Sequence, residues 1–139
     1  RCHQLAEYVI FFSPVTMWSD HVAAYNAEAE CAGFISKIPT VYDETVPLEN
    51  SIGNYVSVAR RKGDEWYVGA ITNWTPRSLS LDLGFLGDGN WEAEVMADGS
   101  DASTNAQSYT RSTISVPADR KVTVKLAAGG GYAMRIYKK

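Results

Sequence analysis

The stretch RSLSLDL, residues 77–83, alternates leucine with serine and aspartate along most of its length. Successive side chains of a β-strand point to opposite faces of a sheet, so this spacing predicts a strand with Leu79, Leu81 and Leu83 on one face. The segment KVTVKL, residues 121–126, repeats the pattern with valine and leucine against lysine and threonine. Both segments therefore predict antiparallel strands that have one buried and one solvated face.

Two further segments carry the same alternation. The segment NWEAEVMA, residues 90–97, predicts a strand with Trp91 inside and with Glu92 and Glu94 in solvent. In YAMRIY, residues 132–137, tyrosine, methionine and isoleucine occupy the buried positions. Both segments extend the same half-buried sheet pattern.

Turn signals rich in glycine, proline and aspartate separate these segments. The pattern predicts strands at residues 40–46, 54–61, 65–73, 77–83, 90–98, 109–117, 120–128 and 131–137. About eight short strands with no helices between them predict a mainly β protein, an antiparallel β-sandwich.

The first 38 residues lack this alternation, and their pattern predicts helical or irregular structure. In NAEAECAGFISKIP, residues 26–39, Cys31, Phe34, Ile35 and Ile38 follow the spacing of one apolar helix face. Asn26 is the expected N-cap and Pro39 the stop. The chain therefore divides into a helical segment, residues 1–38, and a β-sandwich, residues 39–139.

Charge and composition exclude several classes of protein. The formal net charge is −3, which gives no electrostatic footprint for nucleic acid. The chain has no run of about 18 apolar residues, so no membrane span is predicted. It begins with Arg1 in the middle of a pattern, which indicates a piece of a longer protein. Cys2 and Cys31 both fall on apolar helix faces and are expected to be free, buried thiols.

Asp43 and Glu44 lie side by side in PTVYDETVPLEN, residues 39–50. The paired carboxylates of a glycosidase must converge on one bond, about 5 to 9.5 Å apart. Adjacent residues of a strand point to opposite faces, so this pair diverges. We therefore expect a structural or interface role for both acids and no catalytic role.

No other constellation predicts catalysis or a metal site. His3 and His21, the two histidines, lack the spacing of a zinc site. Asp98, Asp101 and Asn105 lie in a glycine-containing loop without the ligand spacing of an EF-hand. Neither catalytic nor metal-binding residues are predicted in this chain.

The tryptophans of the β region differ in their expected environment. Trp66 and Trp91 fall on buried faces, where aromatic residues are common in a sandwich core. Trp74 lies at a strand end next to Pro76 and is the freest of the three. Packing in the core or at a domain interface is the first expectation for it, and a platform for a sugar ring is the alternative.

Four stretches resemble the C-terminal part of glycoside hydrolase family 97: RCHQLAEYVIFFSPVTMWSD, FISKIPTVYDETVPL, VSVARRKGDEWYVGAITNWTPRSLSLDLGFLGDGNWEAEVMADG and LAAGGGYAMRIY. The family contains bacterial α-glucosidases and α-galactosidases. Its members carry an N-terminal β-sandwich, a calcium-dependent (β/α)8 barrel and a C-terminal β-sandwich. The resemblance extends over nearly the whole chain and is most specific in PTVYDET and ARRKGDEWYVGAITNWTPR.

The resemblance implies that residues 1–38 are the last part of the catalytic barrel. YVIFF, residues 8–12, would be a late barrel strand, and Trp18 and Asp20 would lie in the loop after it, in the vicinity of the substrate. AECAGFISKI, residues 29–38, would be the following helix. The catalytic carboxylates and calcium ligands of the family lie in earlier barrel strands, so this chain alone is expected to be inactive and without cofactor.

The function implied by the resemblance is a non-catalytic sandwich that supports barrel packing and homo-oligomerisation. The partners would be the rest of the barrel, further copies and, for the whole enzyme, an oligosaccharide substrate, an α-glucoside or α-galactoside. The expected compartment is the periplasm or cell envelope. The alternative is a carbohydrate-binding module that uses Trp74. Without the barrel, the apolar side chains of residues 1–38 are expected to dock onto the sandwich or onto a second copy.

Overall fold

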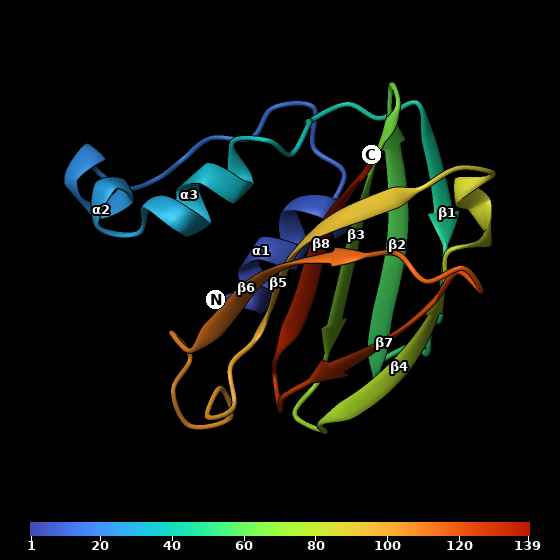
Figure 1. Ribbon diagram of the computed structural model, residues 1–139. Helices are drawn as coiled ribbons and strands as arrows, with labels where there is room; N and C mark the ends of the chain where they lie inside the picture. The colour runs from blue at the N-terminus through green and yellow to red at the C-terminus, as the bar shows by residue number, and fades with distance from the viewer.

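A computed structural model describes all residues from 1 to 139 and has three short α-helices followed by eight strands (Figure 1). The helices are α1 (Cys2–Ile10), α2 (Val22–Ala27) and α3 (Ala29–Ile35). The strands are β1 (Glu44–Pro47), β2 (Tyr55–Lys62), β3 (Glu65–Thr72), β4 (Arg77–Asp82), β5 (Trp91–Asp98), β6 (Tyr109–Ser115), β7 (Lys121–Leu126) and β8 (Gly131–Lys138). A single 3₁₀ turn, Gly84–Leu86, follows β4.

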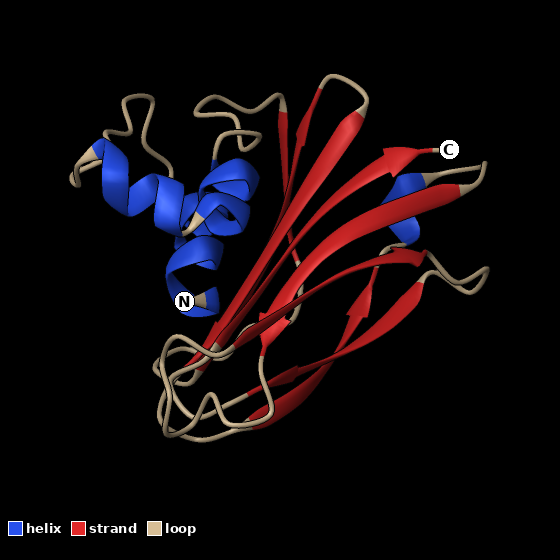
Figure 2. Ribbon diagram, turned by 60° about the vertical axis from the view of Figure 1, so that its left-hand side comes forward, coloured by secondary structure: helices blue, strands red, loops and turns tan.

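The strands form two antiparallel sheets in a sandwich-like arrangement. The larger sheet has six strands in the order β1-β2-β3-β8-β5-β6, and the smaller consists of β4 and β7. Figure 2 shows the small sheet against one side of the large sheet and the helices against the other side. The predicted mainly β, antiparallel fold with a helical N-terminal segment is confirmed.

The space between the sheets holds the main core, a cluster of 18 buried residues. Leu79, Leu81 and Leu83 are at most 4% exposed, and they enter this cluster from the small sheet. Trp66 and Trp91 enter it from the large sheet, each 5% exposed. The alternation of these segments is confirmed, because the leucines point inward and their serine neighbours outward.

The opposite face of the large sheet is covered by α1 and α3. Apolar residues of α1 pack onto this face, where Met96 and Ala133 are fully buried. The approach is close at Gly69, where an added Cβ would lie 2.7 Å from the carbonyl oxygen of Ala6. The expectation of a solvated face is therefore wrong for the central strands β5 and β8, because helices from a distant part of the sequence cover it.

The N-terminal segment differs from the expected barrel elements in one place. Tyr8, Val9 and Ile10 continue α1, and the chain becomes extended only at Phe11. The expected barrel strand at YVIFF is therefore wrong. The reason is the apolar stripe of α1, which repeats with helical spacing and is buried on the sheet (Cys2, Leu5, Ala6 and Val9).

The helix predicted from Asn26 to Pro39 is divided in two. Asn26 lies inside α2, so its predicted role as N-cap is wrong; Glu28 separates α2 from α3. The predicted apolar stripe does dock onto the sandwich at Cys31 and Phe34, which are 6% and 1% exposed. Strand β1 begins four residues later than predicted, since its pairing with β2 starts only at the Asp43 N–H, which donates to the Arg61 carbonyl.

Candidate functional site

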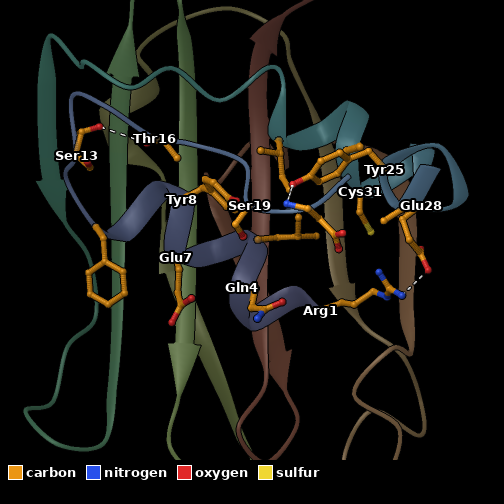
Figure 3. A pocket seen from close by; sticks show the side chains of 16 residues that line it. Arg1, Gln4, Glu7, Tyr8, Ser13, Thr16, Ser19, Tyr25, Glu28 and Cys31 are labelled. Carbon is orange, nitrogen blue, oxygen red and sulfur yellow. Dashed lines mark hydrogen bonds and ion pairs between the residues drawn. The ribbon is translucent and has the colours of Figure 1, made fainter. Parts of the chain in front are cut away.

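A cavity of about 690 Å³ opens between α1, α2, α3 and the loop that joins α1 to α2 (Figure 3). Asp20 contributes to its lining, as do the apolar side chains of Leu5 and Ile35. Arg1 closes one side by donating to the Glu28 carboxylate at 2.5 Å. The cavity has both charged and apolar walls and contains no group of acids arranged as a metal site.

Tyr25 organises the loop in which Trp18 and Asp20 lie. Its ring packs against that of Trp18 with centroids 4.4 Å apart. Its hydroxyl accepts the backbone N–H of Asp20 at 2.7 Å, and the Asp20 carboxylate accepts the backbone N–H of His21 at 2.8 Å. The Asp20 carboxylate therefore bonds to the next residue of the chain, and His21 caps α2 because its Nδ1 accepts the N–H of Ala24 at 3.2 Å.

The same loop carries a concentration of exposed apolar side chains. Of the nine large hydrophobic residues that are exposed in the whole chain, six lie within residues 11–22. We call these six the loop patch: Phe11, Phe12, Val15, Met17, Trp18 and Val22. Their exposure contrasts with the burial of the same residue types in the sandwich, and a concentration of exposed apolar side chains in one segment is typical of an interaction surface.

Asp43 and Glu44 hold the start of β1 to the tip of the β2–β3 hairpin. Asp43 accepts the backbone N–H of Gly63 at 2.8 Å and the Lys62 ammonium at 3.0 Å, while Glu44 accepts from Arg61 at 3.1 Å. The N–H of Gly63, and then Lys62, lower the pKa of Asp43 below its ordinary value. A carboxyl that is held ionised in this way is unsuited to donate a proton, which agrees with a structural role.

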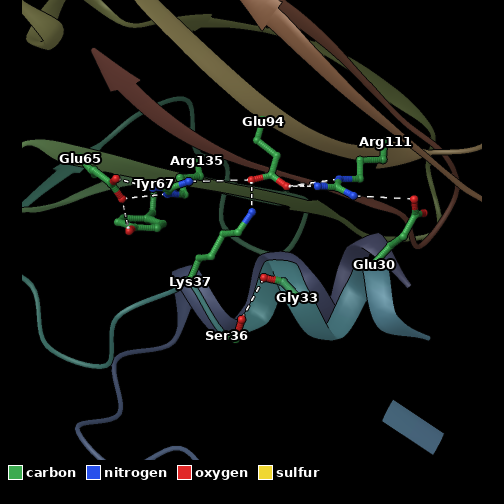
Figure 4. Close-up of polar contacts among 9 residues, drawn as sticks. All are labelled: Glu30, Gly33, Ser36, Lys37, Glu65, Tyr67, Glu94, Arg111 and Arg135. Carbon is green, nitrogen blue, oxygen red and sulfur yellow. Dashed lines mark hydrogen bonds and ion pairs between the residues drawn. The ribbon is translucent and has the colours of Figure 1, made fainter. Parts of the chain in front are cut away.

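A network of charged side chains joins α3 to the large sheet (Figure 4). Its centre is Glu94 on β5, which is only 6% exposed. Glu94 accepts from Lys37 at 2.7 Å and from Arg111 at 2.8 Å, and Arg135 lies 4.0 Å away. Burial raises the pKa of Glu94, but the hydrogen bonds from Lys37 and Arg111 outweigh it and lower the pKa overall.

The network continues along the sheet through Arg135. This guanidinium donates to both oxygens of Glu65, which also accepts the hydroxyl of Tyr67 at 2.7 Å. The hydrogen bond from Arg135 lowers the pKa of Glu65 against the effect of burial. Sequence reasoning missed this network, since it placed Glu94 in solvent. The alternation of residues 90–97 gave no indication that a lysine following α3 covers that face.

A second exposed apolar site lies where three loops meet at the other end of the sheets. Ile52 is fully exposed and Trp74 is 86% exposed. Asn73 joins the loops: its side chain donates to the Gly53 carbonyl at 3.2 Å, and its carbonyl accepts the N–H of Gly129 at 2.8 Å. The Trp74 ring covers Gly129, where an added Cβ would lie 2.9 Å from Trp74 Cζ3.

The remaining candidate residues are taken up by local structure. The carboxylate of Asp98 accepts the N–H groups of Ala127 and Gly131, both at 2.9 Å. No three histidine, cysteine or acidic side chains are placed together as a metal site. Cys2 and Cys31 are free and buried, as predicted, and burial raises the pKa of the Cys2 thiol to about 12. None of the three α-helices has the length and apolarity needed to cross a bilayer.

Residues 41–137 match the family described as "Glycosyl-hydrolase 97 C-terminal, oligomerisation". The chain belongs to this family. The match begins just before β1 and ends within β8, so it coincides with the two sheets.

Relatives of the family extend the likeness to the helical segment. A retaining alpha-galactosidase from Bacteroides thetaiotaomicron is 44% identical over 136 residues, which are 98% of this chain and 20% of that protein. A family 97 enzyme from Pseudoalteromonas sp. strain K8, solved in complex with acarbose, superposes with a TM-score of 0.94 at 32% identity. That likeness covers 99% of this chain and 22% of the enzyme.

A crystal structure of a beta-arabinopyranosidase is also similar, with a TM-score of 0.78 and 28% identity over 96% of this chain and 20% of that enzyme. In each comparison, the chain spans about a fifth of the relative's length. The C-terminal family model covers residues 41–137, and the likeness to these enzymes extends over the helical segment as well.

Proposed function

We propose that this chain is the non-catalytic C-terminal part of a longer family 97 glycosidase. In that enzyme, the helical segment, residues 1–38, packs against the rest of the catalytic barrel, and the sandwich, residues 39–139, supports packing and homo-oligomerisation. The loop patch carries the proposal, because six large apolar side chains within twelve residues are left 40% to 82% exposed in this chain. Burying a large apolar side chain stabilises a complex by about 1.5–3 kcal/mol, so this surface favours a protein partner.

The cavity between the helices supports the same assignment. It is open and lies beside the loop patch, since Phe11 lines it and also belongs to that patch. The carboxylates that contribute to the cavity include Asp20, which accepts the backbone N–H of His21, and Glu28, which is paired with Arg1. The cavity combines these groups with apolar walls, and a surface of this kind is suited to receive side chains of neighbouring barrel elements.

The longer enzyme is proposed to hydrolyse an α-glycoside within an oligosaccharide, with an α-galactoside as the first choice and an α-glucoside as the second. The first choice follows the 44% identical relative, whose name is retaining alpha-galactosidase. The calcium ion expected in the barrel would be held by residues outside this chain, which itself has no cluster of acids suited to it. The proposed compartment is the periplasm or cell envelope.

The direct test is hydrolysis of p-nitrophenyl α-galactoside and α-glucoside by the 139-residue chain, with and without calcium. We expect no turnover above the rate of a blank in any of the four assays. Calcium-dependent turnover that copurifies with the chain and disappears in Glu44→Gln would overturn the non-catalytic assignment. Glu49→Gln is the matched control, because the carboxylate of Glu49 is exposed and makes no hydrogen bond or ion pair in the structure.

A carbohydrate-binding module that uses Trp74 is the second candidate, and the exposure of the indole favours it. The neighbouring amides do not support it, because the side chain of Asn54 is bonded within its own loop and that of Asn73 to the adjacent loop. Sugar-binding platforms combine an aromatic ring with free polar groups that fix the orientation of the ligand. Titration of the intrinsic fluorescence with methyl α-galactoside and maltotriose tests this role, and we expect no change.

A further inference from the structure

We propose that Ile52 and Trp74 form the centre of the surface through which a second copy of this chain binds. The inference rests on the proposed assembly role and specifies its surface. The family match covers residues 41–137 and its description names oligomerisation. Within that range, only Val41, Ile52 and Trp74 are large hydrophobic residues left exposed. Val41 lies in the connection from the helical segment, so Ile52 and Trp74 are the exposed apolar residues of the sandwich loops.

The surface is held in place before any partner binds. The N–H of Asn73 donates to the Asn54 carbonyl at 2.8 Å, which joins the loop of Trp74 to the loop of Ile52. Gly129, at φ +64, provides the flat backbone that the indole covers. Loops that are already held together lose little conformational freedom on association, and tryptophan is frequent at the energetic centres of interfaces.

The polar groups around the two side chains are satisfied within the chain. Asn73 Oδ1 accepts the N–H of Thr75 at 3.0 Å and the Arg77 guanidinium at 3.2 Å. Asn54 donates to the Ser51 hydroxyl at 3.0 Å. These loops present apolar surface whose amides are already bonded within the chain, and the charge of the Arg77 guanidinium is held by Thr72, Asn54 and Asn73. Polar groups that are already bonded are less available to a ligand, which favours an apolar protein partner over a sugar.

The same end of the molecule also has a hollow that could receive a side chain. A shallow cavity of about 480 Å³ is lined by Ile52, Val56 and Ile71, together with the asparagines of the loop. A two-fold axis brings the same patch of both subunits together, so each subunit can offer Trp74 to the hollow of the other. A stable interface buries about 1,600 Å² in total, of which two side chains supply only a part. The surrounding loops would therefore form its rim.

The position of this surface allows both proposed contacts to exist at once. Figure 1 shows the loops before β2, between β3 and β4 and between β7 and β8 at the lower end of the sheets. The loop that carries the loop patch lies at the upper left, next to the end where Asp43 meets Gly63. A copy that binds at the lower end therefore leaves the loop patch free for the barrel.

The test is sedimentation velocity of the full 139-residue chain over a wide range of protein concentration. The variants are Trp74→Ala and Ile52→Ser, with Trp74→Phe as the conservative change. The matched control is Met17→Ala, which truncates an equally exposed side chain, 82% against 86%, in the loop patch. Circular dichroism and thermal midpoints verify that each variant is folded.

We expect the unmodified chain to dimerise and Trp74→Ala to weaken the dimer by about 30-fold or more, the effect of an interface hot spot. Trp74→Phe is expected to fall between them, and Met17→Ala to leave the dimer unchanged. If Met17→Ala loses the dimer while Trp74→Ala and Ile52→Ser retain it, the proposed surface is wrong, but the proposed assembly role stands. A chain that is monomeric at every concentration would contradict the assembly role itself. A fluorescence response to maltotriose or methyl α-galactoside that Trp74→Ala abolishes would assign the site to a sugar instead.

Discussion

The two faces of the six-stranded sheet are buried in different ways. One face packs against β4 and β7 through an apolar cluster to which each strand contributes alternate residues. The other is covered by α1 and α3, with an apolar centre around Phe34 and a charged network around Glu94. The apolar face needs only hydrophobic residues of suitable size, whereas the helix face depends on particular partners in particular places.

The charged network has a different physical role from the apolar core. Removing two charges from water costs about as much as their attraction returns, so a buried ion pair adds little net stability. Its geometry, however, is specific: Lys37 follows α3, while Glu94 and Arg111 belong to adjacent strands β5 and β6. We infer that the network fixes where α3 lies on the sheet, while the apolar contacts supply most of the free energy of folding.

The largest expected loss of stability comes from a substitution in the apolar core between the two sheets. Leu81→Ala removes a side chain that is completely buried between the sheets. We expect a loss of about 2–5 kcal/mol in the free energy of unfolding, because the lost burial and the remaining cavity act together. Urea denaturation followed by tryptophan fluorescence measures it. Ser80→Ala, on the outer face of the same strand, is the control, and an equal loss in both variants would contradict the two-layer description.

The next prediction tests the packing of the helices on the large sheet without changing the core between the two sheets. Gly69→Val places a side chain against the carbonyl oxygen of Ala6, 2.7 Å from the new Cβ. Since backbone cannot move aside cheaply, α1 must shift, and we expect about 1–3 kcal/mol of destabilisation. The rate of thiol labelling at neutral pH detects a displacement of α1, because Cys2 is fully buried in the unmodified chain and becomes reactive only when α1 moves. Protection of Cys2 in Gly69→Val would show that the close approach of α1 is not required.

Gly33→Val is the matched control for this change. An added Cβ at Gly33 meets no atom within 4 Å, so the thiol reactivity of Cys2 should stay as in the unmodified chain. A similar increase in both variants would point to general loosening of the helices rather than displacement of α1.

The smallest expected effect tests the charged network through pH. The folded-state pKa of Glu94 is lowered, so the folded protein releases this proton more readily than the unfolded chain. The stability that the carboxylate contributes is complete above the ordinary glutamate value of 4.5 and is lost as the pH falls through the folded-state pKa. Glu94→Gln should cost about 1–2 kcal/mol at neutral pH, since Lys37 and Arg111 can recover water when a neutral amide replaces the carboxylate.

Denaturation curves measured at a series of pH values test this prediction. The difference between the unmodified chain and Glu94→Gln should shrink as the pH falls below 4.5, because protonation neutralises Glu94 in the former. Glu92→Gln, on the same strand and bonded only to the exposed Lys139, is the control and should change little. If the difference in the free energy of unfolding between the two proteins stays constant down to acid pH, the charge of Glu94 does not contribute to stability through this network.

The residues that sequence reasoning placed correctly are those whose environment follows from local spacing. The leucines of 77–83 and the tryptophans Trp66 and Trp91 are buried, and Trp74 is exposed, as expected. In each case the nearest neighbours in the sequence decide which side of a strand a residue occupies. The structural role expected for Asp43 and Glu44 stays a prediction, and the two acids do not diverge as strand neighbours would, because Asp43 precedes β1 and both carboxylates approach Arg61.

The errors have different causes. Glu94 is buried although the alternation predicts solvent, because its partner Lys37 lies 57 residues away in the chain. The spacing of the α1 stripe is itself helical, and only the family resemblance implied a barrel strand at Tyr8–Ile10. Phe11 and Phe12 remain exposed although docking is the expectation for the apolar side chains of residues 1–38, since periodicity does not report what covers a segment.

The sequence by itself determined the class of the fold, the approximate strands and the side of each outer strand that faces the core. These follow from a period of two residues, which is a property of the local backbone. Only the tertiary structure decided that the large sheet is covered on both faces, that Glu94 is buried, and that Ile52 and Trp74 lie together at one end. Those features depend on which distant segments pack against one another, and the free energy of that packing is shared by the whole chain.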